Sequence, residues 1–135
     1  MARLLPADFD LGGIEPSERR VSESFLAGLD DTWWVLPQVR IADPADPEID
    51  LLLVSPTNGA VVVEVKGGVI SLRDGDWYSY DHRLKRSPVT QALQGKHALV
   101  RRLRKQNVDL NDIFIEHAIA IRVKEQRRAR IRRGV

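Results

Sequence analysis

The chain has 135 residues, no cysteine and a formal net charge of +2, with 43% hydrophobic and 30% charged residues. This length suits one domain with a single core, and the lack of cysteine excludes disulfides and thiolate metal sites. No apolar run approaches the roughly 20 residues of a membrane span, and Asp8 and Asp10 interrupt the stretch that a secretory signal would need to be apolar. The composition predicts a soluble, cytoplasmic protein that does not bind membranes.

Charge is distributed unevenly along the chain. Residues 1–82 contain 6 Lys and Arg against 15 Asp and Glu, residues 83–105 contain 8 basic residues and no acidic one, and residues 122–135 contain 7 basic and 1 acidic. An acidic region beside basic ones suits a protein that binds metal ions in one place and phosphates in another. We expect residues 1–121 to form the domain and residues 122–135 a basic C-terminal tail, which is either a nucleic-acid-binding arm or a solvated, disordered end.

The first predicted element is a helix over residues 17–29, with Ser17 as its N-cap. At 100° per residue, Glu18 lies on the apolar stripe of this helix, and Glu23 lies about 140° away on the solvent side. Glu18 is therefore the carboxylate directed at the interior. A purely structural role for Glu18, as an acid that complements the helix dipole, remains an alternative.

Residues 33–41 predict a strand, in which Pro37 favours an edge position or a bulge because proline cannot donate to a sheet ladder. A loop over residues 42–48 then leads to a second strand, residues 49–54, which Asp50 opens. Asp50 is a candidate site residue. The alternative is an acid that only hydrogen-bonds nearby backbone.

The most informative stretch is a predicted hairpin. Residues 55–59 form a dense turn signal, Ser-Pro-Thr-Asn-Gly, and the β-branched run over residues 60–66 is too short for a typical helix. Glu64 and Lys66 lie two apart on this second strand and so share a face. Because the run is apolar on both faces, it fits a strand near the middle of a covered sheet. A carboxylate and an ammonium there are costly unless they pair or bind something.

Gly67-Gly68 predicts a break before a strand over residues 69–73, and Asp74-Gly75 predicts a hairpin turn that returns the chain through Tyr80. We expect Trp77 to pack on the sheet, with base stacking as the alternative. His82 and His97 are expected at the surface, because nothing near them has the spacing of a zinc site.

A second helix is predicted over residues 88–106, with Ser87 as N-cap and Pro88 at its first position. Lys96 falls within its apolar stripe and is either snorkelling or reaching toward an acid. Gln91 lies about 140° from the centre of the stripe, so amphipathicity does not place it at a site. The apolar stripe expected on this second helix contains Val89, Ala92, Leu93, Leu99, Val100 and Leu103.

A last strand is predicted over residues 115–121.

The order of charged residues resembles the PD-(D/E)XK nuclease motif, since Asp50 lies 14 positions before Glu64 and Lys66 completes a Glu-x-Lys. Residues 17–21 upstream (Ser-Glu-Arg-Arg-Val), Trp77 after the hairpin and residues 88–92 downstream (Pro-Val-Thr-Gln-Ala) extend the match. Over roughly residues 17–121 the chain resembles the nuclease-related domain (NERD) family. It departs from the family pattern in having Ile rather than Pro before Asp50, and Ser17 where Gly is common.

The resemblance implies an α/β fold with a restriction-endonuclease-like core, a central mixed β-sheet flanked by α-helices. It also implies that Glu18, Asp50 and Glu64 hold Mg²⁺ or Mn²⁺, the hard cations that carboxylate sites favour. Lys66 would then orient or deprotonate the attacking water, with Gln91 supporting Lys66 or that water.

The predicted function is a metal-dependent nuclease domain that hydrolyses phosphodiester bonds, with DNA as the expected partner and a helicase or kinase as a further candidate partner. The alternative is a non-catalytic module on the same fold that binds nucleic acid or protein, in which Glu64 and Lys66 form a structural ion pair. The residues predicted to contact nucleic acid are Lys96, Arg101, Arg102, Arg104 and Lys105.

Overall fold

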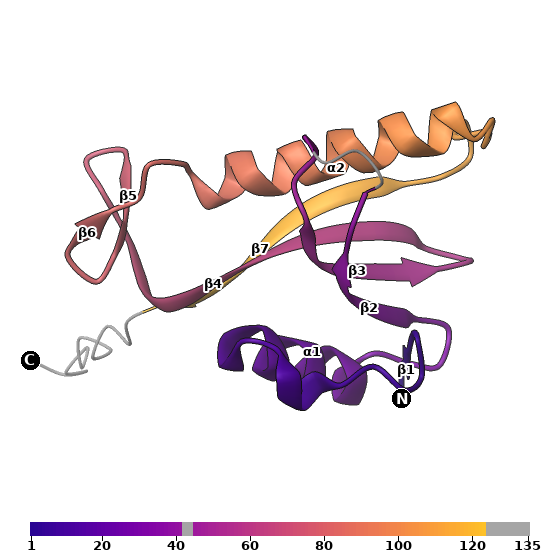
Figure 1. The fold of residues 1–135 in the computed structure, drawn as a ribbon, viewed down its shortest axis with the longest axis horizontal. Helices are drawn as coiled ribbons and strands as arrows, with labels where there is room; N and C mark the ends of the chain where they lie inside the picture. Colours follow the sequence, from indigo (N-terminus) through magenta and orange to yellow (C-terminus); the bar gives the residue numbers. More distant parts are fainter. Residues whose placement is uncertain (42–44, 124–135) are drawn as a thin grey trace, which may run out of the picture.

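The structure is a computed structural model that describes residues 1–41 and 45–123. A mixed β-sheet lies between two helices, which confirms the predicted α/β class with a restriction-endonuclease-like core (Figure 1). None of the described helices is both long and apolar enough to cross a membrane. The elements are β1 (Arg3–Leu4), the 3-10 helix η1 (Leu11–Gly13), α1 (Pro16–Gly28), β2 (Trp34–Val39), β3 (Ile49–Ser55), β4 (Gly59–Arg73), β5 (Asp76–Ser79), β6 (His82–Arg83), α2 (Pro88–Lys105) and β7 (Ile115–Val123).

Strand β4 is the centre of the sheet, as its β-branched, two-sided apolar sequence predicts. The strand order is β1-β2-β3-β4-β5-β6, and β7 pairs parallel with β4. The same residues of β4 pair with β3 and with β7, so these two strands occupy its opposite edges. Residue Val62 of β4, for example, lies between Leu52 of β3 and His117 of β7.

The two helices cover opposite faces of the sheet, as Figure 1 shows. Alternate residues of β3 and β4 point to each face, which divides the apolar side chains into two clusters. The cluster on the α1 face contains the buried residues Ala2, Val35, Leu51, Leu53, Val63 and Val65. The cluster on the α2 face contains Ile49, Leu52, Val62, Leu99 and Ile115.

The two strands predicted on either side of Gly67-Gly68 are one 15-residue strand, so the expected break is wrong. The glycines instead produce an irregularity, because the pairing of β4 with β7 shifts register between Lys66 and Val69. Gly68 has φ +80. A Cβ at Gly67 would lie 3.1 Å from Ser17 Oγ, so the start of α1 packs closely on the strand at this point.

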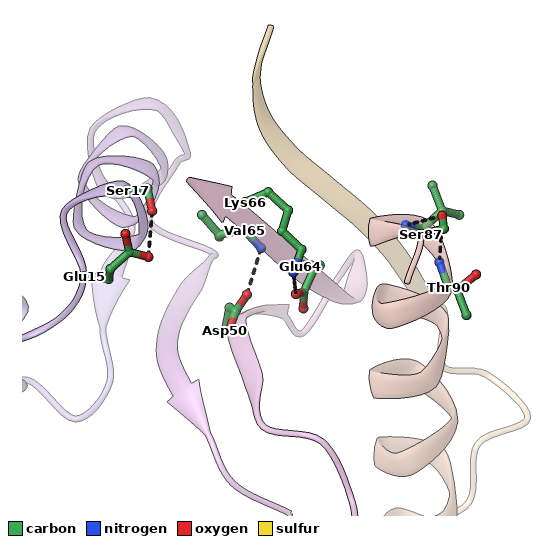
Figure 2. Close-up of polar contacts among 9 residues, drawn as sticks. Glu15, Ser17, Asp50, Glu64, Val65, Lys66, Ser87 and Thr90 are labelled. Carbon is green, nitrogen blue, oxygen red and sulfur yellow. Dashed lines mark hydrogen bonds and ion pairs between the residues drawn. The ribbon is translucent and has the colours of Figure 1, made fainter. Parts of the chain in front are cut away.

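The helix ends show one correction. Helix α1 begins at Pro16 with Glu15 at the N-cap position, so Ser17 is not the N-cap. Proline at the first helical position is pre-organised for the helix and has no N–H to satisfy, and Ser17 Oγ donates a 3.0 Å hydrogen bond to Glu15 Oε2 (Figure 2). In α2 the prediction is confirmed, since Ser87 Oγ accepts from the backbone N–H of Val89 at 3.2 Å.

Several surface predictions can also be checked. His82 and His97 are exposed, as expected, but Val89 is 42% exposed and so does not belong to the buried stripe of α2. Pro37 lies on β2 beyond the two residues that pair with β1, which confirms an edge position within the described sheet. The last strand ends at Val123, two residues later than predicted. Residues 124–135 of the predicted tail lie outside the described residues.

Candidate active site

The candidate site forms where β3 separates from β4. The ladder between these strands ends at Leu51 paired with Val63. Beyond it, the backbone N–H of Val65 donates to Asp50 Oδ2 at 2.9 Å (Figure 2). The Asp50 side chain thus supplies the acceptor that a backbone carbonyl of β3 would otherwise provide. This backbone partner lies 15 residues away on β4, so it is not the local backbone bond given above as the alternative for Asp50.

On the same edge of β4, pairing with β5 begins only at Ile70. Residues 64–69 of β4 therefore face no strand of the described chain on this edge. We call this stretch the β3–β5 gap. Glu64 and Lys66 therefore lie on a stretch of β4 whose backbone is unpaired by β3 or β5 on this edge.

Glu64 and Lys66 form an ion pair in this gap, with Lys66 Nζ 3.3 Å from Glu64 Oε1 (Figure 2). The Lys66 side chain is only 24% exposed, and the Glu64 side chain is only 14% exposed. Burial, then the charge of Asp50, raises the pKa of Glu64 to about 7, although Lys66 acts in the opposite direction. Asp50 and Glu64 are close enough to repel each other as carboxylates, which is the electrostatic arrangement that a cation would relieve.

Glu18 approaches the same acids from α1. Its pKa is raised, first by partial burial and then by the charge of Asp50. Gln38 Nε2 donates to Glu18 Oε2 at 3.3 Å, from a backbone position with φ +50 at the end of β2. Glu23 points to solvent and pairs with Arg19 at 2.8 Å. The predicted assignment of Glu18 to the interior side is thus confirmed, whereas Gln38 was not anticipated from the sequence.

The acids do not form a complete ligand cage. Among the described residues, no group of three or more His, Cys, Asp or Glu side chains is arranged to hold a metal ion. The structure brings Asp50 and Glu64 together and places Glu18 within electrostatic reach of Asp50. Since Mg²⁺ is usually bound by one or two carboxylates plus water and phosphate oxygens, the pair of Asp50 and Glu64 fits such an ion.

Gln91 lies closer to the site than its helical angle indicated. A Cβ at Gly95 would lie 3.1 Å from Val62 Cγ1, so this side of α2 rests on β4. Helix α2 runs back along β4 (Figure 1). Gln91 lies four residues before Gly95, about 6 Å along the helix, and Glu64 lies two residues after Val62, about 6.6 Å along the strand. Gln91 is therefore near the level of Glu64. Its Oε1 is buried and has no hydrogen-bond partner within the described part of the chain.

The predicted nucleic-acid-binding residues of α2 differ in their surroundings. Lys96 Nζ lies 4.0 Å from Glu116 Oε2, which supports the reading that Lys96 reaches toward an acid. Arg101 Nη2 contacts Asp46 Oδ1 at 2.9 Å, an ion pair that the sequence did not suggest. Arg102 is half-buried, and Arg104 and Lys105 are exposed in the last turn of α2.

Replacement of Glu64 and replacement of Asp50 should have opposite effects on the stability of the metal-free protein. A carboxyl with pKa about 7 in the folded chain and 4.5 when unfolded disfavours folding once pH rises through this range. Glu64→Gln should therefore stabilise the metal-free protein at pH 8 by about 1–2 kcal/mol, less than the full shift implies because water screens a carboxylate beside the gap. At pH 4 the change should have little effect, because the carboxyl is then protonated in both states.

Asp50→Ala should act in the opposite direction. It leaves the buried N–H of Val65 without an acceptor, which costs about 1–3 kcal/mol. Urea unfolding of both variants in EDTA at pH 4 and pH 8 measures the two effects. A Glu64→Gln change of equal size at both pH values would show that the titration of Glu64 is not the cause.

The comparisons with known proteins point to one family. A family model described as a nuclease-related domain (NERD) matches residues 15–121. A search of curated proteins and a search of solved structures gave no match. The matched residues include both helices and most of the sheet, and they cover far more than half of the chain. The chain therefore belongs to the nuclease-related domain family.

Proposed function

We propose that this chain is a divalent-metal-dependent nuclease domain that hydrolyses phosphodiester bonds in DNA. The observation that carries the proposal is the gathering of Asp50, Glu64 and Lys66 at the β3–β5 gap. A partly buried carboxyl whose pKa is raised, as that of Glu64 is, next to other charged side chains is typical of catalytic sites.

The role proposed for each side chain follows from its position in the site. Asp50 and Glu64 would hold Mg²⁺ or Mn²⁺, with Glu18 as a third carboxylate at the edge of the cluster. The bound ion would polarise a phosphoryl oxygen and lower the pKa of an attached water. Lys66, whose Nζ lies 3.3 Å from Glu64 Oε1, would orient the attacking water and neutralise charge on the phosphate.

Gln91 would complete this arrangement from α2. Its buried Oε1 can accept a hydrogen bond from the Lys66 ammonium or from water, and within the described residues it has no other partner. During hydrolysis a bond forms between the water oxygen and phosphorus while the bond to the leaving oxygen breaks. Holding water and Lys66 in fixed positions is the main contribution that these side chains can make.

A non-catalytic module that binds nucleic acid or protein is the second candidate. The ion pair between Lys66 and Glu64 favours it, because each charge already has a partner and the acids form no three-residue ligand group among the residues described. In this reading the same fold would bind a partner through its basic residues and cut nothing.

One assay separates the two functions. Purified protein is incubated with single- and double-stranded DNA in Mg²⁺, in Mn²⁺ and in EDTA, and with RNA in parallel. We expect cleavage products only with a divalent ion, and none from the Asp50→Asn/Glu64→Gln double variant. If no nucleic acid is cut under any condition, the nuclease proposal fails and the binding module replaces it.

A further inference from the structure

A polar pocket of about 410 Å³ lies on the exposed side of α2. Gln94, His97 and Arg101 are spaced three and four residues apart, so they lie along one face of the helix. All three are exposed. The opposite wall is the segment that leads into β3. The described residues that line it are Ala45, Asp46, Pro47, Arg86, Gln94, His97 and Arg101.

The chemistry of the lining suits an anion. Arg86 and Arg101 carry positive charge, and the side chains of His97 and Gln94 can each donate an N–H. Among the described residues that line the pocket, Asp46 is the only acid, and its contact with Arg101 is short, at 2.9 Å. Arg101 remains 58% exposed despite this ion pair, so part of its guanidinium fork faces solvent. A planar fork of this kind binds phosphate oxygens bidentately.

The position of the pocket connects it with the candidate active site. Asp46 lies four residues before Asp50, and Arg86 lies five residues before Gln91. Four residues of extended chain span at most about 14 Å, a distance of a few nucleotides along a strand. The surrounding segment, residues 83–105, contains 8 basic residues and no acidic one, so its charge complements the phosphates of a nucleic-acid strand.

We infer that this pocket binds one backbone phosphate of the nucleic-acid strand whose scissile bond lies at the β3–β5 gap. The inference rests on the proposed function and extends it, because Arg86, Gln94 and His97 were not among the predicted contact residues. Asp46 has two effects here. It holds Arg101 in place, and it competes with the phosphate for the same guanidinium.

Binding to a fluorescent 20-base-pair duplex in EDTA, followed by anisotropy from 50 to 200 mM salt, tests this inference without requiring cleavage. Arg86→Gln/Arg101→Gln should weaken binding roughly tenfold, the scale of one lost charge-assisted contact. It should also reduce the slope of log K against log salt by about 0.9. Asp46→Asn should instead tighten binding. The matched control, Arg19→Gln on α1, removes a surface charge that pairs with Glu23 and should not change the slope.

The outcomes separate this inference from the proposed function. If the wild-type protein binds neither DNA nor RNA, the proposed function itself fails. If it binds, and the double variant has the slope of the control, only the phosphate pocket is overturned. Displacement of the duplex by polyglutamate as readily as by unlabelled duplex would also overturn it. Folding of each variant is checked by urea unfolding, in which loss of a surface ion pair has little effect.

Discussion

Lys66→Ala is expected to reduce metal-dependent phosphodiester cleavage by about 100-fold or more while leaving Mn²⁺ affinity nearly unchanged. A loss of this size is usual for removing a general base or a positioning cation. The reason is that the Lys66 ammonium lies 3.3 Å from Glu64 Oε1, on a stretch of β4 that is unpaired with β3 and β5. Alanine removes the ammonium and leaves both carboxylates in place.

Single-turnover cleavage rates and calorimetric titration with Mn²⁺ measure the two quantities on the same preparations. Arg19→Ala is a suitable control, since Arg19 also forms a salt bridge with a glutamate but lies on the solvent side of α1. The opposite pattern is equally informative. If Lys66 only neutralises Glu64, its removal should raise the pKa of Glu64 further and weaken metal binding, because a proton then competes with the metal.

Removal of either central carboxylate should reduce Mn²⁺ affinity by about 100-fold or more, since losing even an outer-shell partner commonly costs 10- to 100-fold. The variants are Glu64→Ala and Asp50→Ala. Glu23→Ala serves as the control, because Glu23 is exposed and paired with Arg19. Calorimetric titration measures the affinities, and wild-type affinity in both site variants would show that these acids are not ligands.

The affinity of the wild-type protein should also depend on pH. Only the deprotonated carboxylate binds the metal, and the pKa of Glu64 is about 7. Below pH 7 the apparent affinity should therefore fall by roughly tenfold per pH unit, and above it the affinity should level off. In Glu64→Ala this dependence should disappear between pH 6 and pH 8. A retained dependence would mean that another group titrates.

Side-chain periodicity made part of the site predictable. Two-residue spacing on a strand places Glu64 and Lys66 on one face, and the structure has them in contact. The 3.6-residue period of a helix separates Glu18 from Glu23, and only Glu18 lies near the other acids. These relations are local, so they can be read before the fold is known.

Relations between distant segments could not be read in this way. The partnership of Gln38 with Glu18 depends on a backbone position with φ +50, which no residue preference of glutamine predicts. The approach of Gln91 to the level of Glu64 follows from the contact of Gly95 with Val62, a long-range packing that the polarity pattern of α2 does not encode. Gly67-Gly68 suggested a break because glycine favours turns, yet pairing with β7 on both sides of the glycines keeps β4 a single strand.

The hydrogen bond from Val65 to Asp50 has a consequence for how this domain can change over evolutionary time. The Glu64 carboxylate destabilises the metal-free fold, because its pKa is raised to about 7, whereas Asp50 completes the backbone bonding of β4. A descendant released from selection for cleavage would be expected to lose Glu64 early and to retain Asp50 or another acceptor at its position. In a relative that retains this aspartate but has lost the Glu-x-Lys pair, the aspartate would be retained for folding. Its presence alone should therefore not be taken as a sign of an active nuclease.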